Sequence, residues 1–319
     1  MCVQRIVMIL HQFPDLQWLK QQADQRFINR KGVGGSSLPN EGWPTVILNT
    51  QTKSTYRDNI LGPLSLFLNL AGESSVSVAG KSVRIKEGLF FLSNADQHYT
   101  LEVDEKKPVE TFNIHFGEYF ADQIFEALKN KVENLLDNTF QTPHVPMAFH
   151  NRLQSQNDFL KKIVLAIKQH GENDALFREE KLIELLTHLL KQESEIVKMR
   201  GTIPAIKSST REEILQRLFY STDYIYSNYH KALSLEELAQ ASCLSKFHFL
   251  RLFKIAFRKT PHQFVTEVRL KKAQELLKHT KLTIHEVSRS IGFDNASSFS
   301  RLFYNSTGVY PTHYQSIIS

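Results

Sequence analysis

An internal repeat near the C-terminal end constrains the fold of this chain more than any other feature of its sequence. The segment SLEELAQASCLSKFHFLRLFKIAFRKTPHQF begins at Ser234, and TIHEVSRSIGFDNASSFSRLFYNSTGVYPTHY begins at Thr283. The Arg-Leu-Phe triplets at Arg251 and Arg301 align at an offset of 50 residues. Because a repeat of this kind is one supersecondary unit used again, the same short structure is predicted twice.

Each copy of the repeat opens with the signature of a helix N-terminus. A Ser or Thr is followed three residues later by Glu, which predicts a capping box. The first helices are predicted over Leu235–Ala241 and Ile284–Ser290, and after a tight turn Ser245 and Asn295 cap the second helices. Two short helices joined by a turn are typical of the helix-turn-helix motif. The capping pairs are Ser234 with Glu237 and Thr283 with Glu286, and Thr210 with Glu213 predicts the start of an earlier helix.

The second helix of each copy has a predicted core side and an outward side. Arg251 and Arg301 take the same place on the outward side, where an Arg can pair bidentately with guanine O6 and N7. Phe247 and Leu250 on that side suit contacts with thymine methyl groups. The alternative is that the arginines form surface ion pairs and the Phe packs on a neighbour. The predicted core stripes are Phe249, Leu252, Phe253 and Ala256 in the first copy, and Phe299, Leu302, Phe303 and Ser306 in the second.

The stretch between the copies, PHQFVTEVRLKKAQELLKHT, predicts one long helix. Thr260 caps it, and Pro261 takes the first helical position, where proline is tolerated. About 18 residues at ~1.5 Å each give a rod of ~27 Å, and successive major-groove faces of DNA are ~34 Å apart. One chain could therefore hold two recognition helices in adjacent grooves. Lys271 and Lys272 on this helix either touch phosphate or are solvated.

The positive charge of the chain lies in the same region. The formal net charge is +6, and Ser209–Ser319 holds 15 Lys and Arg against 9 Asp and Glu, so the rest of the chain is neutral. This distribution predicts a polyanion partner, double-stranded DNA, for the C-terminal part alone. A solvated basic surface is the alternative.

The N-terminal part shows the alternating periodicity of short strands. Glycines mark several turns between them, and closely spaced strands of this kind predict a β-sandwich or small barrel. Helical patterns are predicted at 15–28 and again after Gly117, with Ile124, Leu128, Val132 and Leu135 at helix spacing. A leucine stripe at 182–190 is either helix packing on this domain or a dimer seam. The predicted strands are 45–49, 63–70, 75–80, 89–93, 98–103 and 109–116.

The C-terminal residues resemble the AraC/XylS family of bacterial transcription regulators over about the last 100 residues. The matches are LSKFHFLRLFK with TPHQF in the first copy and IGFDNASSFSRLF with YPTHY in the second. The resemblance implies that Lys246–Phe257 and Asn295–Asn305 are the recognition helices. The DNA-binding residues predicted on them are Lys246, Phe247, Leu250, Arg251, Lys254, Ala296, Ser297, Ser300 and Arg301.

Two residues depart from the pattern of this family. Tyr304 stands where the second recognition helix is usually basic, which predicts a weaker phosphate contact there. Leu250 takes a position at which this family more commonly has a polar residue that contacts a base. The leucine favours contact with a methyl group, so the base preference of the family is not carried over to this position.

The N-terminal part resembles the cupin-like sensor domains of this family through its β pattern and GLFFLSNADQHYTLEV. A metal cupin would need a His-x-His pair with a Glu. The segment NLAGESSVSVAG contains no such histidine pair, so no metal or cofactor is predicted. His98, Asn113 and His115 are candidate ligand-binding residues, since Thr111, Asn113 and His115 share one strand face. The alternative is that this face points to water or that the histidines are structural.

The predicted fold class is α+β, with a β-rich cupin-like barrel and trailing helices followed by an all-α double helix-turn-helix domain. The low cysteine count and the lack of targeting segments indicate a cytoplasmic protein. The resemblance implies an activator that works through RNA polymerase, with a sensor domain for an unknown small-molecule effector. The leucine stripe together with this resemblance predicts a homodimer. The predicted parts are a sensor domain at 1–145, a helical dimerisation or packing segment at 146–198, a linker at 199–208 and the DNA-binding domain at 209–319.

Two other functions remain open at this stage. One is a ligand-independent DNA binder whose N-terminal domain only dimerises, and the other is a cupin-type enzyme. The two cysteines, Cys2 and Cys243, allow no disulfide framework within the chain, and Cys243 is expected to be buried. The apolar run in MCVQRIVMILHQFPD has no cleavage site after it, and no stretch approaches the ~18 apolar residues of a membrane span, so neither a signal peptide nor a span is expected.

Overall fold

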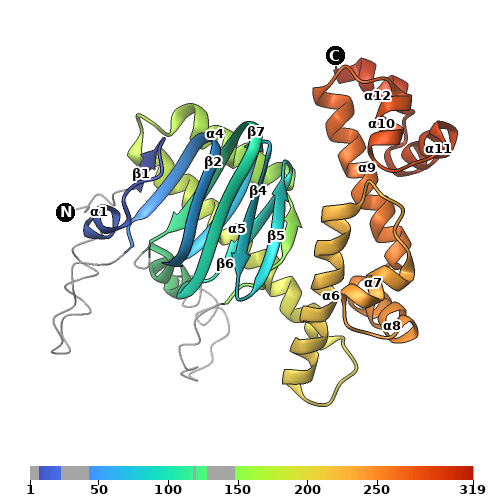
Figure 1. The fold of residues 1–319 in the computed structure, drawn as a ribbon, viewed down its shortest axis with the longest axis horizontal. Helices are drawn as coiled ribbons and strands as arrows, with labels where there is room; N and C mark the ends of the chain where they lie inside the picture. The colour runs from blue at the N-terminus through green and yellow to red at the C-terminus, as the bar shows by residue number, and fades with distance from the viewer. Residues whose placement is uncertain (1–6, 23–42, 118–119, 128–147, 319) are drawn as a thin grey trace. The chain divides into compact units, whose positions relative to one another are not determined.

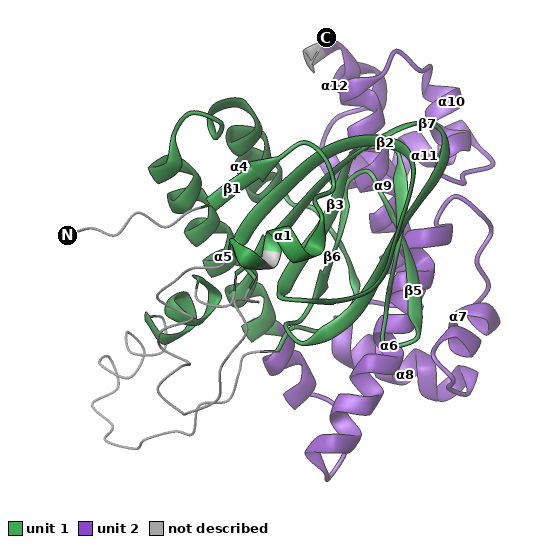
Figure 2. Cartoon of the chain, turned by 60° about the vertical axis from the view of Figure 1, so that its left-hand side comes forward, with its two compact units in different colours: residues 1–195 green, residues 196–319 purple. Residues whose placement is uncertain are grey.

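The computed structural model describes residues 7–22, 43–117, 120–127 and 148–318. The chain divides into two compact units, Met1–Glu195 and Ile196–Ser319 (Figure 2). The first unit is rich in strands and the second is helical, so the fold is α+β as predicted (Figure 1). No helix among the described residues has both the length and the apolar character needed to cross a membrane.

The described strands of the first unit form one eight-stranded sheet. Its order is β1-β2-β7-β3-β6-β8, and the β4–β5 hairpin pairs with β7 outside this path. The strands are β1 (Val7–Leu10), β2 (Thr45–Gly62), β3 (Leu64–Ala71), β4 (Glu73–Val78), β5 (Lys81–Lys86), β6 (Leu89–Ser93), β7 (Gln97–Phe116) and β8 (Leu153–Ser155).

Strands β2 and β7 are far longer than the sequence predicts, because β7 joins two predicted strands into one. They pair as an antiparallel ribbon with irregularities in its register, and such bulges bend a strand. The indole Nε1 of Trp43, just before β2, donates to the carbonyl of Leu61 near its far end at 2.9 Å. The rings of Tyr99 and His115, near opposite ends of β7, stack with centroids 6.0 Å apart. The ribbon therefore curls until its two ends meet.

The predicted barrel is not closed by backbone pairing. Among the described strands the hydrogen bonds run in an open order from β1 to β8, and side chains join the ends of the curled ribbon. The reason is that closure needs a matched strand number and stagger. Alternation of apolar and polar residues along one strand carries no information about the number of strands or their stagger.

Helices cover one face of this sheet (Figure 1). They are α4 (Asp158–His170), α5 (Ala175–Gly201) and the helical residues 120–127. The leucines of the 182–190 stripe are no more than 5% exposed and pack in one core with sheet residues such as Phe90 and Phe112. The packing interpretation of the stripe is confirmed, and the stripe is not free to form a dimer seam.

Some predicted helices lie partly outside the described residues. The helix predicted at 15–28 is described only as α1 (Leu16–Gln21). Ile124 is buried as expected, whereas Leu128, Val132 and Leu135 lie outside the described residues.

The second unit contains two helical cores joined by one helix. Phe249 and Phe253 lie in the first core, and Phe299 and Phe303 lie in the second. Helix α9 contributes to both cores. The helices are α6 (Ser208–Asn228), α7 (Leu235–Ala241), α8 (Lys246–Phe257), α9 (Pro261–His279), α10 (Ile284–Ser290), α11 (Ala296–Thr307) and α12 (Pro311–Ile318).

Local signals located most of these helices. The capping boxes predicted at Ser234 and Thr283 form, and Thr260 makes a further one with Gln263. Asn295 accepts backbone bonds as the cap of α11, whereas Ser245 takes the N-cap position of α8 without a side-chain bond.

Two residues of α6 and α11 do not have the roles that the sequence predicts. Helix α6 begins at Ser208 with Lys207 as its N-cap, so Thr210 lies inside the helix and caps nothing. Ser306 is exposed, because the apolar stripe of α11 ends at Phe303. Of the predicted linker, residues 202–207 lie between α5 and α6.

The two helix-turn-helix turns share one backbone feature. Cys243 has a φ of 50° in the first copy, and Gly292 has a φ of 85° in the second. Each residue ends a short helix at a position where the chain must adopt the left-handed conformation. Cys243 is exposed there, so the expectation that it is buried is wrong.

Candidate nucleic-acid interface

The outward face of α8 is exposed as the sequence predicts. Phe247 is 86% exposed, although an apolar ring of this size is normally covered in a folded protein. The predicted core residues on the other side, Phe249, Leu252, Phe253 and Ala256, are buried. The fold therefore fixes which side of α8 is offered to a partner. Its exposed members are Lys246, Phe247, Leu250, Arg251 and Lys254.

One of the predicted cations on this face is already paired. The ammonium of Lys246 donates to the carboxylate of Glu236 on α7, and this bond lowers the pKa of Glu236. Arg251 and Lys254 have no ion-pair partner within the described part of the chain. The free positive charge of α8 therefore comes from these two residues.

Helix α11 presents the corresponding face of the second copy. Ser297 and Arg301 are exposed, and Ala296 and Ser300 are partly buried. The side chain of Asn295 accepts from the backbone nitrogen of Ser297 at 2.8 Å, which fixes the start of the helix. The helix begins one residue later and ends two residues later than the sequence predicts.

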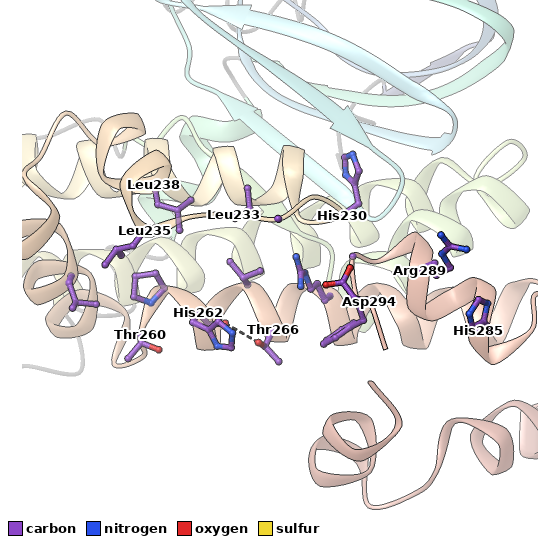
Figure 3. Close-up of a pocket in the computed structure, with 17 residues that line it drawn as sticks. His230, Leu233, Leu235, Leu238, Thr260, His262, Thr266, His285, Arg289 and Asp294 are labelled. Atoms are coloured by element: carbon purple, nitrogen blue, oxygen red, sulfur yellow. Dashed lines mark hydrogen bonds between the residues drawn. The ribbon is translucent and has the colours of Figure 1, made fainter. Parts of the chain in front are cut away.

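A groove of about 770 Å³ lies along α9 and is lined by both copies of the repeat (Figure 3). Leu250 contributes to its wall, so the groove adjoins the outward face of α8. Its lining mixes apolar and polar residues, and the charged ones are two arginines, Arg269 and Arg289, against one Asp294. The polar and basic lining consists of His230, Thr260, His262, Thr266, Arg269, His285, Arg289 and Asp294.

The two arginines of this groove have different roles. Arg269 donates to the backbone carbonyls of Tyr229 and Lys231 at 2.8 Å each, and burial lowers its pKa. It therefore holds the connection before α7 against α9. Arg289 is exposed, and no ion pair of its side chain is found within the described residues, so its charge is available to a partner.

Lys271 and Lys272 on α9, for which the sequence allows either a phosphate contact or a solvated side chain, also differ. Lys271 is exposed, whereas the ammonium of Lys272 lies 3.1 Å from the carboxylate of Glu275 one turn along the helix. Of the pair, Lys271 has the more accessible charge for a phosphate.

The structure brings together two of the three predicted ligand-binding residues. Asn113 and His115 are buried on one face of β7, while His98 is exposed. Side chains alternate along a strand, and the buried Tyr99 shares the face of His115, so His98 lies on the other face. The amide Nδ2 of Asn113 is buried without a hydrogen-bond partner.

His115 lies in an aromatic cluster inside the curled sheet. The rings of Trp43, Phe67 and Tyr99 have centroids 5.8, 5.7 and 6.0 Å from its own. Its Nδ1 lies 2.8 Å from the hydroxyl oxygen of Ser65. These contacts pack His115 against the other aromatic rings inside the unit.

The stability of the first unit is expected to fall in mild acid because of His115. Burial lowers the pKa of His115 to about 4, while an imidazole of an unfolded chain titrates near ~6.5. Since the folded pKa is the lower one, the contribution is complete above pH ~6.5 and is lost towards about pH 4, by about 3 kcal/mol in total. Urea unfolding followed by Trp fluorescence at pH 7.5 and 5 measures this unit, because both tryptophans, Trp18 and Trp43, belong to it.

Two substitutions separate His115 from the general effect of acid. His115→Gln should flatten the pH dependence, whereas His98→Gln, at an exposed histidine of the same strand, should leave it unchanged. An equally steep pH dependence in His115→Gln would contradict the assignment.

Among the described residues, no three His, Cys, Asp or Glu side chains are grouped in a way that could hold a metal ion. The buried polar side chains of the sheet include the hydroxyl of Thr111, the amide of Asn113 and the imidazole of His115. These groups suit hydrogen bonding to a small polar molecule.

Comparison with known proteins agrees with both units. Residues 45–186 match the profile of the AraC-like ligand binding domain, and residues 238–317 match that of a helix-turn-helix domain. The chain is similar to the probable transcriptional regulator LumQ of Photobacterium leiognathi, with 24% identity over 79% of this chain and 89% of LumQ. It is also similar to the lactose operon transcription activator of Staphylococcus xylosus, with 24% identity over 73% of this chain and 76% of that protein.

Among solved structures, the C-terminal domain of AraT, a response regulator from Geobacillus stearothermophilus, is 29% identical over 32% of this chain and 84% of that domain, with a TM-score of 0.31. An AraC-like ligand-binding domain followed by a basic double helix-turn-helix unit defines a DNA-binding transcription regulator. The chain belongs to the AraC/XylS family of these regulators, with a cupin-like N-terminal domain.

Proposed function

We propose that this chain binds one specific DNA site through two adjacent major-groove segments, with α8 in one and α11 in the next. The observation that carries the proposal is the pair of matching outward faces, each with an exposed Arg at the same place and each backed by its own aromatic core. Helix α9 has 19 residues, or a length of about 28 Å. This length suits recognition helices about one turn of DNA apart.

The residues proposed to contact DNA fall into two groups. Arg251 and Arg301 lead the base readout, with Phe247 and Leu250 against thymine methyl groups. Lys254, Ser297 and Ser300 contact bases or the neighbouring backbone, together with Ala296. Lys246 contributes less net charge than the sequence suggests, because it is paired with Glu236.

The experiment that tests this function is selection of sites from a randomised duplex pool by the full chain at two salt concentrations. The proposal expects a bipartite site with halves about one helical turn apart. Binding that is equal on all sequences and disappears with salt would contradict it, because phosphate contacts alone behave in that way.

We further propose that the first unit binds a small polar effector at Asn113 and His115. The unpartnered amide of Asn113 supports this, since a buried donor without a partner is costly unless a ligand or water satisfies it. A ligand that binds only the folded state raises the melting temperature. The full chain should therefore show such a shift with one member of a library of sugars, amino acids and organic acids, and Asn113→Ala should remove that shift.

The absence of any stabilising compound would favour the alternative of a ligand-independent DNA binder. The proposal assigns the chain no catalytic role. Activation through RNA polymerase is proposed because the similar protein from Staphylococcus xylosus is named as a transcription activator. A second copy of the chain remains a proposed partner, with a surface other than the buried 182–190 stripe as its contact.

A further inference from the structure

A hollow of about 430 Å³ lies on the exposed side of α11. Four of its lining residues are the predicted DNA contacts of that helix, Ala296, Ser297, Ser300 and Arg301. The other two are Tyr304 and Tyr310, for which the proposed function so far has no role. Tyr304 is also the residue that departs from the basic pattern of the family.

The two tyrosines form a stacked pair on the surface. Their ring centroids are 4.6 Å apart with an angle of 26° between the planes. Tyr304 is 43% exposed and Tyr310 is 56% exposed, so neither belongs to the core around Phe303 and Tyr314. Stacking restricts the side chain of Tyr304 before any partner binds, and a side chain held in this way loses little entropy on binding.

The position of Tyr304 on the helix indicates which part of DNA it meets. The first residues of a recognition helix contact base edges. Tyr304 lies eight residues after Ala296, or about 12 Å along the axis, and the major groove is about 12 Å wide. A side chain at that distance reaches the sugar-phosphate wall of the groove. Tyr hydroxyls are among the groups that donate to phosphate oxygens.

We propose that Tyr304 and Tyr310 form an uncharged contact for the DNA backbone. The hydroxyl of Tyr304 donates to a phosphate oxygen, its ring packs on the adjoining deoxyribose, and Tyr310 is a positioning residue that holds the ring of Tyr304. This inference rests on the proposed function, because it requires α11 to lie in the major groove. The contact replaces a basic residue without adding positive charge, so it releases no counterion and adds little to the salt dependence of binding.

The test measures the affinity of the full chain for its selected site over a series of salt concentrations. Tyr304→Phe removes only the hydroxyl and should weaken binding by roughly 5- to 10-fold, with an unchanged slope of log affinity against log salt. Tyr304→Lys should steepen that slope by about 0.9, the value for one added phosphate contact. Tyr310→Ala should weaken binding by a smaller factor in the Tyr304→Phe variant than in the parent chain, because the two side chains act as one unit.

The control is Tyr56→Phe, which removes an exposed phenol hydroxyl from the first unit and should leave the affinity unchanged. Melting curves of each variant confirm that it folds. Unchanged affinity in Tyr304→Phe together with an unchanged slope in Tyr304→Lys would overturn the backbone contact. A loss in Tyr304→Phe confined to sites with one particular base would also overturn it, in favour of base readout. If the parent chain shows no sequence-specific binding, the proposed function itself fails, which is a different result.

Discussion

Replacing Gly292 with alanine should destabilise the second helix-turn-helix by about 3 kcal/mol, the sum of a left-handed backbone cost and a steric cost. A Cβ at this position would lie 2.7 Å from the carbonyl oxygen of His230 and 2.9 Å from its carbonyl carbon. Both are backbone atoms, and Arg269 holds that segment by bonds to the carbonyls on either side of it. The neighbour therefore has little freedom to move away.

The backbone conformation alone does not explain this expectation. Cys243 takes the same place in the first turn with a φ of 50°, so a residue with a side chain is tolerated there. Gly308 supplies the matched control, because its φ is 77° and a Cβ added to it would meet no other atom within 4 Å. Gly308→Ala should show the conformational cost alone, about 1 kcal/mol.

Amide hydrogen exchange of residues 284–307 in the full chain measures the effect of both substitutions. Gly292→Ala should raise exchange across α10 and α11 far more than Gly308→Ala, and it should weaken binding to the α11 half of the site while leaving the α8 half. Equal exchange in the two variants would show that the close approach to His230 does not determine the stability of the second copy.

Replacing Arg251 with alanine should cost about 1–3 kcal/mol at one base position and relax specificity there. The guanidinium is exposed and has no ion-pair partner among the described residues, so its removal leaves the fold intact. A bidentate pair with guanine is lost only at the base pair that it reads. The measurement is the affinity of the variant for the selected site and for each single-base change in it.

Lys254→Ala is the control on the same face of α8. As a phosphate contact it should weaken binding by a similar factor on every sequence and lower the salt slope by about 0.9. If Arg251→Ala behaves in this way instead, Arg251 is a backbone contact and the base readout of the first copy depends on Phe247 and Leu250.

The second unit could be predicted closely because its determinants are local. Capping boxes at Ser234 and Thr283 place the short helices to the residue, and the spacing of Phe249 and Phe253 identifies the buried side of α8. The pairing of Lys246 with Glu236 was missed, because those residues lie on different helices and meet only through the turn between them. The sequence signal for this ion pair was a Lys and a Glu ten residues apart on either side of a predicted turn.

The first unit could be predicted only in part because its pairings are non-local. Alternation identified the shared face of Asn113 and His115, but the sequence showed two strands where β7 is one, so it did not show that His98 lies on the other face of the same strand. Strands β1, β5 and β8 carry weak local patterns and were missed. The stack of Tyr304 on Tyr310 was also missed, since it depends on how the segment before α12 returns to α11.

The most direct test of two-groove binding by one chain is insertion of base pairs between the halves of the selected site. Helix α9 joins the two cores with buried residues in each, so the spacing of α8 and α11 is fixed. Binding of the full chain should fall strongly with an insertion of five base pairs. It should remain low with ten, because the spacing of the helices is fixed, although ten base pairs place both halves on the same side of the DNA again. Full affinity at ten would show a flexible connection, and unchanged affinity at both would show that a single helix reads the site.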